Sequence, residues 1–258
     1  KSADGWHRFI ALTAFDEKGW RDHSDGSLQN VFVKVGKTQE DTNWDVSYMF
    51  GNSKLVGNGL TPSTNYGSLT SPSFTSTSKG YYDTNRASVY TWPDQTVNKA
   101  HILSFNLQHV LDANTELATT AYVRYGTQGR KGGDVEWDDT DSEAEYVINK
   151  SSTTEKTVGI ATNFTKILNQ HQLTSGATIE RNTMSYGATQ SQNCSLSSSR
   201  EVSGCESTID TAGVKGTTTA FGTYLADTYK LSDKSYVTVA GRFNQTTVKN
   251  TLLTYNAE

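Results

Sequence analysis

Apolar and polar residues alternate with a period of two along most of this chain. Within residues 235–250, Val237, Val239 and Phe243 share one face, and Arg242 lies on the other. This period predicts extended strand, because successive side chains of a strand point to opposite faces. The run is about a dozen residues long, which exceeds the roughly 5–6 residues of an average globular strand and fits the roughly 9–11 tilted residues that cross a bilayer in a barrel.

Nine such runs follow one another. We expect strands at about residues 6–15, 28–38, 43–50, 103–108, 117–125, 158–164, 173–179, 217–230 and 235–250. Their connections alternate between short turns and long loops, and the longest loops are expected at about 51–97, 127–153 and 187–216. Compact soluble domains rarely contain structureless loops of that length, whereas membrane barrels have short periplasmic turns and long outer loops.

The pattern therefore predicts an all-β fold, an antiparallel up-and-down transmembrane β-barrel segment that forms a single domain over residues 1–258. Bacterial single-chain barrels close on an even number of strands, so nine strands predict a piece of a larger barrel. Several aromatic residues lie near the expected strand ends, where their rings favour the bilayer interface. They are Trp6, Trp20, Trp44, Tyr48 and Phe50.

Composition leaves two classes of protein open. Hydrophobic residues make up 34% of the chain, below the roughly 45–50% (with Gly) of an average globular domain, yet 13 Tyr and 5 Trp argue against disorder. A membrane barrel with an apolar exterior and a water-filled interior is consistent with this composition. A secreted β-sandwich that binds carbohydrate or mediates adhesion is equally consistent with it. The net charge of −4 gives no indication of nucleic-acid binding, and no apolar run is long enough for a transmembrane helix.

The two cysteines and the charged residues supply few candidates for chemistry. Cys194 and Cys205 share one Ser- and Gly-rich segment, which predicts a disulfide-closed ring in an oxidising compartment, with two unpaired thiols as the alternative. The acidic stretch 134–143 is either a calcium-binding loop or a solvated charged loop. The five histidines are scattered, so we assign no metal site, no cofactor and no catalytic residue.

Short motifs occur in a fixed order along nearly the whole chain. They are Gly19-Trp20-Arg21-Asp22, Gly57-Asn58-Gly59-Leu60, Trp92-Pro93-Asp94-Gln95-Thr96, Tyr122-Val123-Arg124, Tyr224-Leu225-Ala226-Asp227-Thr228-Tyr229 and Gly241-Arg242-Phe243-Asn244. In this order and with these loop lengths the chain resembles the TonB-dependent outer-membrane receptors, in particular the ferrichrome-type siderophore receptors. The resemblance implies a barrel of about 22 strands with a plugged lumen, of which this chain would supply about nine, without the plug domain or the C-terminal strands.

The resemblance also implies a location, a ligand and partners. We expect the Gram-negative outer membrane, a ferric siderophore or another scarce small ligand, contacts with membrane lipid and lipopolysaccharide, and a plug domain and TonB in the full-length protein. We expect no nucleic-acid partner and no enzymatic activity. A secreted β-sandwich is the competing class, and a barrel hydrolase comes third.

Aromatic residues of the long loops are the candidates for ligand contact. They are Trp20, Tyr66, Tyr81, Tyr82, Trp92 and Trp137. For Trp20 and Trp92 the alternative is packing within the loops or in the interfacial belt. Arg124 and Arg242 alternate with apolar neighbours, so we expect both to face the lumen, where they either meet solvent and ligand or support packing against the plug.

Overall fold

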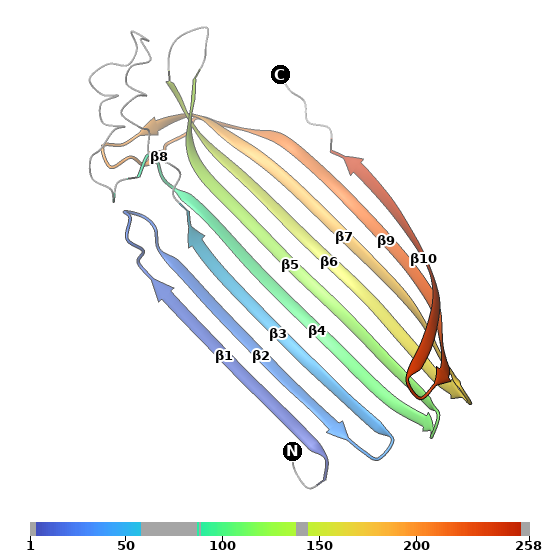
Figure 1. Ribbon diagram of the computed structural model, residues 1–258. Coiled ribbons are helices and arrows are strands. Elements are labelled where there is room, and N and C mark those ends of the chain that lie inside the picture. The colour runs from blue at the N-terminus through green and yellow to red at the C-terminus, as the bar shows by residue number, and fades with distance from the viewer. Residues whose placement is uncertain (1–3, 58–86, 88, 138–143, 254–258) are drawn as a thin grey trace.

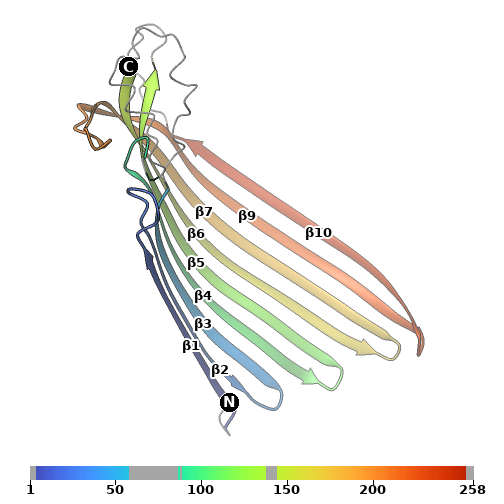
Figure 2. The ribbon, with the colours of Figure 1, turned by 60° about the vertical axis from the view of Figure 1, so that its left-hand side comes forward.

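The structure is a computed structural model that describes residues 4–57, 87, 89–137 and 144–253, and these residues form one continuous antiparallel sheet. The strands are β1 (Trp6–Glu17), β2 (Gly26–Thr38), β3 (Thr42–Val56), β4 (Asp94–Asp112), β5 (Thr115–Trp137), β6 (Ala144–Leu168), β7 (His171–Leu196), β8 (Val202–Ser203), β9 (Ser207–Ser232) and β10 (Ser235–Leu252). Figures 1 and 2 show them side by side in one curved layer, with the short β8 beside β7. No helix in the described part of the chain has the length and apolar character needed to cross a membrane.

The path of the chain is strictly up and down. Each long strand pairs with the next along the chain in the order β1-β2-β3-β4-β5-β6-β7-β9-β10. Four tight hairpins lie at one end of the sheet, and the longer connections lie at the other (Figure 1). The predicted all-β, up-and-down architecture is therefore confirmed, and the described residues form one sheet where a sandwich would have two.

The loop bounds predicted from the sequence are wrong, because the strands continue far into those segments. β5 extends to Trp137 and β6 starts at Ala144, so most of the segment 127–153 is strand. β7 and β9 likewise occupy most of 187–216, while β3 and β4 shorten the 51–97 loop at both ends. These extensions are rich in Ser, Thr, Lys and Gly and lack apolar alternation. Residue-by-residue pairing with equally long neighbours holds them in the sheet.

One face of the sheet carries a continuous apolar surface, which we call the apolar face. The pairing register places Val33, Tyr48, Leu103, Val123 and Val158 in a single row across β2 to β6. Neighbouring rows continue this surface to β10. Val123 and Val158 are 53% and 54% exposed, so no protein layer in the described chain covers them. The opposite side, the polar face, carries the intervening residues.

Aromatic rings mark two levels of the apolar face. Trp6 and Trp44 meet edge to face at 5.8 Å near the hairpin end. Farther along, His101 lies 4.9 Å from the ring of Phe50 and 6.0 Å from that of Tyr125. Phe50 lies six positions after Trp44 in β3, roughly 20 Å along the strand. Two aromatic levels that enclose an apolar band are typical of sheets that cross a bilayer.

The sheet has almost no interior core. Among the described residues, the buried apolar side chains are Val89, Val147, Ile148, Cys194 and Val202, and all lie at the end of the sheet that carries the long connections. Backbone pairing between long strands is therefore the main internal source of stability. It also satisfies the peptide groups of the ladder, as a hydrocarbon environment requires.

Candidate functional site

The polar face is tied together by hydrogen bonds that cross several strands. Lys34 on β2 forms an ion pair with Asp45 on β3 at 2.9 Å. Asn106 on β4 donates to Asp45 Oδ1 at 2.9 Å, and Thr120 on β5 donates to Asn106 Oδ1 at 2.9 Å. Asp45 is only 8% exposed, so the bonds to Lys34 and Asn106 compensate for the water that its carboxylate loses. The result is a fixed polar wall over four strands.

Two tyrosines reinforce this wall by lying across glycines. The Tyr122 ring covers Gly159 on the neighbouring strand, where an added Cβ would meet it at 2.5 Å, and its hydroxyl donates to Glu180 on β7. Tyr224 covers Gly176 in the same way and donates to Asn163 Oδ1 at 2.8 Å. Each tyrosine thus spans three strands, and the glycine provides the room for its ring.

Arg124 and Arg242 both lie on the polar face. Arg242 is paired with Tyr224 in the register, and its Nε donates to Asn244 Oδ1 at 2.9 Å. Arg124 Nη2 donates to Thr157 Oγ1 at 3.3 Å, and Thr157 is almost fully buried. Both guanidinium groups thus belong to the hydrogen-bonded wall.

Segments far apart in sequence form a cap at the end of the sheet that carries the long connections. Trp92 exchanges backbone hydrogen bonds with Arg200 and Val202 at 3.0 and 2.8 Å, and its indole Nε1 donates to Ser199 O at 2.9 Å. The ring of Trp92 stacks on His23 from the β1–β2 connection, with centroids 4.1 Å apart. Trp92 is therefore held in place by other segments of the chain.

Tyr90 and Gly133 extend the same cap. Arg200 Nε donates to Tyr90 O at 2.6 Å, and the guanidinium lies 5.3 Å from the Tyr90 ring. Thr91 donates to Gly133 O at 2.6 Å, while Gly133 N–H donates to Pro93 O at 2.7 Å. These bonds join the segment before β4 to the ends of β5 and β8.

The predicted disulfide between Cys194 and Cys205 is confirmed. Cys194 forms a small buried cluster with Ile148 and Val202, and Cys205 packs against it. The bridge closes the connection that contains Arg200 and thereby holds β8 over the ends of β5 and β6.

Replacing both cysteines with serine is expected to open this connection. Loss of the cross-link widens the conformational range of residues 197–206, so trypsin should cut after Arg200 roughly tenfold faster or more. Cleavage after Lys230, in the β9–β10 hairpin, provides the control and should keep its rate. Equal rates after Arg200 in the variant and the wild type would show that the disulfide does not hold the cap.

The structure separates the predicted ligand-contact residues. Trp20 is 70% exposed, with the Arg21 guanidinium 5.9 Å from its ring, whereas Trp92 takes part in the cap. Trp137 is the last residue of β5, and nothing further of its side chain is described. Tyr66, Tyr81 and Tyr82 lie outside the described residues.

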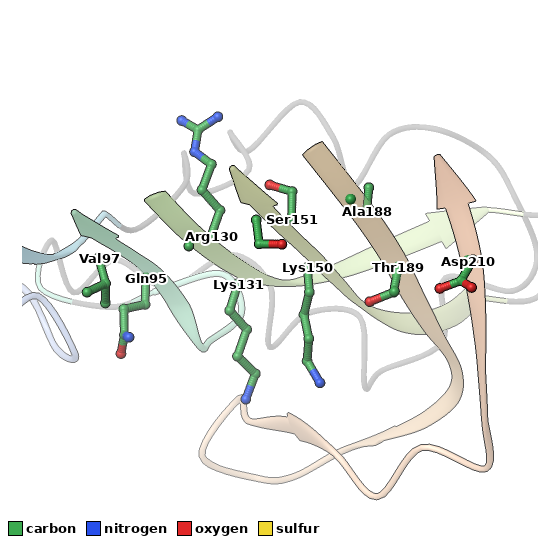
Figure 3. A pocket seen from close by; sticks show the side chains of 12 residues that line it. Gln95, Val97, Arg130, Lys131, Lys150, Ser151, Ala188, Thr189 and Asp210 are labelled. Carbon is green, nitrogen blue, oxygen red and sulfur yellow. The ribbon is translucent and has the colours of Figure 1, made fainter. Parts of the chain in front are cut away.

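Two hollows lie near the ends of β4 to β9 that carry the long connections. Charged residues that the sequence analysis did not single out line both of them. On the polar face, Asp94, Arg130, Asn149 and Tyr186 line a hollow of about 420 Å³. On the other side, Lys131, Lys150 and Asp210 help to line a hollow of about 480 Å³. Figure 3 shows Lys131 and Lys150 side by side, with Arg130 pointing the opposite way. Alternation within each strand accounts for this separation, and the predicted loop over 127–153 hides it at the level of the sequence.

Two further observations concern charge at this end. Lys54 Nζ donates to Asp25 Oδ2 at 2.9 Å, and this hydrogen bond lowers the pKa of the Asp25 carboxyl below its ordinary value. Within the described chain no three His, Cys, Asp or Glu residues are grouped so that they could hold a metal ion, and part of the acidic stretch 134–143 lies outside that description.

Comparison with known proteins relates the sheet to solved structures only. Neither a protein-family model nor a curated protein sequence matches the chain. The ferric-catecholate import receptor Fiu from E. coli superposes with a TM-score of 0.71 at 13% identity, over 97% of this chain and 42% of that one. The ferric citrate transporter FecA gives 0.69 at 12% identity, over 97% and 34%. The ferripyoverdine receptor of the outer membrane of Pseudomonas aeruginosa gives 0.66 at 11% identity, over 99% and 36%.

This chain thus spans about a third to two-fifths of the length of those proteins. At such low identity the superposition establishes the fold. The resemblance to TonB-dependent siderophore receptors is confirmed at that level, and the chain has the fold of part of their barrel wall.

Proposed function

We propose that this chain forms part of the barrel wall and outer mouth of a TonB-dependent receptor that takes up a ferric siderophore across the Gram-negative outer membrane. The division of one sheet into an apolar face and a hydrogen-bonded polar face carries this proposal. Lipid would cover the apolar face, and the polar face would line a wet lumen or contact a plug. The superposed structures, which are described as receptors and transporters of ferric ligands, support it.

The asymmetry of the connections supports one orientation of the sheet in the membrane. Tight hairpins suit the periplasmic side, and the cap with its longer connections suits the cell exterior. In a membrane the edges of β1 and β10 need partners, because hydrocarbon cannot satisfy their free peptide groups. We infer that further strands close the barrel around a plug.

The polar-face hollow is the candidate for the first contact with ligand. Arg130 supplies a cation, and Tyr186 and Asn149 supply an aromatic ring and an amide. Such a set suits a compact chelate with anionic oxygens, because Arg forms charge-assisted hydrogen bonds with them. Trp20, exposed at the same end, offers a second aromatic surface. Arg124 and Arg242 lie deeper along the strands and would face the lumen.

Uptake by cells tests the proposal directly. Cells that lack the gene should take up radiolabelled iron from one of three supplied chelates, ferric citrate, a ferric catecholate or ferripyoverdine, at less than roughly a tenth of the parental rate. The full-length gene should restore uptake only when TonB is present. Uptake of every tested chelate at parental rates without the gene, or restored uptake without TonB, would contradict the proposal.

A matched pair of variants tests the contact residues. Replacing Arg130 with Gln and Tyr186 with Ala together should raise the half-saturating chelate concentration roughly tenfold, because one charged and one aromatic contact are lost. Lys99→Gln removes a charge from the apolar face of the neighbouring strand β4, outside the residues that line the hollow, and should leave uptake unchanged. An equal effect of both changes would place the ligand elsewhere.

A further inference from the structure

The polar face changes its composition from one side of the sheet to the other. At the level of the polar-face hollow, β5, β6 and β7 present Gln128, Thr153 and Tyr186 in one row. The same row begins with Phe15 on β1 and Leu28 on β2. One row across the face that would meet water therefore passes from apolar to polar side chains.

Leu55 on β3 extends the apolar part of this face, and we call Phe15, Leu28 and Leu55 the mouth patch. Leu55 pairs with Gly26, and a Cβ added to that glycine would lie 3.5 Å from Leu55 Cδ2, so the leucine side chain extends over β2. Leu55 is 53% exposed, although β2 and β4 flank its strand on both sides. Exposed apolar side chains that lie together are typical of a surface that binds a partner or a ligand.

A second apolar group lies deeper on the same strands. The rings of Phe9 and Phe32 have centroids 5.9 Å apart, and Met49 pairs with Phe32. The row that contains Thr13 and Asn30 separates this group from the mouth patch. The β1 to β3 side of the polar face thus presents apolar surface at two depths.

Charges on either side of the mouth patch indicate how an anionic ligand would lie. Leu55 shares its row with Arg130, and Thr96 is the one residue between them. Two strand spacings, roughly 10 Å, therefore separate Leu55 from Arg130. On the other side, a Cβ added to Gly26 would lie 3.5 Å from Glu17 Oε1. Because Glu17 repels an anion and Arg130 attracts one, the charged part of a ligand belongs over β5 and its uncharged part over β2 and β3.

We propose that the receptor takes up an amphiphilic ferric chelate, whose iron-bearing head lies in the polar-face hollow and whose apolar chain or ring lies on the mouth patch. Charge complementarity places the head at Arg130, and burial of apolar surface places the chain on Leu28 and Leu55. A short alkyl substituent on the head spans the distance between these two regions. The inference rests on the proposed function, because it names the class of chelate that the same site accepts.

Binding by the full-length receptor in lipid nanodiscs tests this class of ligand. The probes are ferric complexes of citrate, a catecholate and pyoverdine, each prepared with a hexyl and with a methyl group at one position away from the iron ligands. Isothermal titration gives the Kd, and titration of empty nanodiscs corrects for partition of the hexyl forms into lipid. For at least one head the wild type should bind the hexyl form roughly tenfold more tightly or better, because more apolar surface is buried.

Two double variants locate the chain. Leu28→Ser with Leu55→Ser removes most of the mouth patch and should reduce the hexyl preference to about twofold or less. Its Kd for the methyl form should stay within about twofold of wild type, which shows that the protein is folded and that the head still binds. Phe9→Ser with Met49→Ser is the matched control, since it removes exposed apolar side chains deeper on the same face and should leave the hexyl preference unchanged.

Several results would overturn the proposal. Equal Kd values for the hexyl and methyl forms of every head would do so, as would a hexyl preference that persists in the Leu28 and Leu55 variant. Equal loss of the preference in the Phe9 and Met49 variant would also contradict a site at the mouth. If the Leu28 and Leu55 variant kept the preference but unfolded at a lower urea concentration, the plug domain would be the occupant of the patch and the proposal would be wrong.

The methyl forms keep this inference separate from the proposed function. A receptor that binds and transports a methyl form without preferring the hexyl form would retain the transport function and lose only the amphiphilic class of ligand. A receptor that takes up none of the chelates in either form would contradict the transport proposal itself. Iron uptake measured with the methyl forms distinguishes the two outcomes.

Discussion

Replacing Ile160 with lysine is expected to destabilise the folded barrel by about 2–4 kcal/mol, because a cation at mid-depth on the lipid side loses its hydration. Ile160 lies on β6 in the apolar row with Ala121 and Ile179, and its side chain is 45% exposed in the isolated sheet. In a bilayer that exposed area would face hydrocarbon. The free energy of unfolding should therefore fall, measured by urea titration of the full-length protein refolded in lipid vesicles.

Ala161→Lys provides the control, because the adjacent residue adds the same charge at the same depth but on the polar face. Its free energy of unfolding should stay within about 1 kcal/mol of wild type, since solvent and polar neighbours surround it. Equal destabilisation by the two changes would show that the face we call apolar does not contact lipid. That result would remove the main support for a transmembrane sheet.

Residue alternation predicted those parts of the sheet where one face is apolar. The strands expected at 28–38, 43–50 and 117–125 are found within β2, β3 and β5, and the register places Val33, Tyr48 and Val123 in one row on one face. The prediction works there because apolar residues occupy every second position while the other face stays polar. The turn around Asp233 was equally clear, since polar residues interrupt two strong runs.

Alternation fails beyond the apolar band. In β5 the residues after Tyr125 read Gly-Thr-Gln-Gly-Arg-Lys-Gly-Gly, and the facing part of β6 is rich in Ser and Thr. Both faces of this extension are polar, so no hydrophobic period distinguishes strand from loop. Pairing with β4 and β7 supplies the missing constraint, and such long-range pairing is not encoded locally.

The cap could not be predicted from the sequence either, because it also depends on contacts between distant segments. Trp92 stacks on His23 and bonds with residues around Arg200, partners that are far away along the chain. An aromatic residue in a long loop suggests ligand contact until its neighbours are known. The structure shows that Trp92 serves the cap, whereas Trp20 remains exposed.

Gly159→Val is expected to lower the free energy of unfolding by about 2 kcal/mol, even though valine favours strands. A Cβ at this position would lie 2.5 Å from the Tyr122 ring, so the ring must move and its hydroxyl must release Glu180. A lost hydrogen bond to a charged acceptor costs about 1.5–3 kcal/mol, which outweighs the strand preference of valine. Urea titration of the refolded full-length protein measures the change.

Gly129→Val is the matched control, because no atom lies within 4 Å of the corresponding Cβ, and it should be neutral or stabilising. A double-mutant cycle isolates the cause. In a Tyr122→Ala background the ring is absent, so Gly159→Val should cost less than about 0.5 kcal/mol. If the full cost persisted without the ring, the strain would arise in the backbone of β6, and the tyrosine would not fasten β5 to β7 across the polar face.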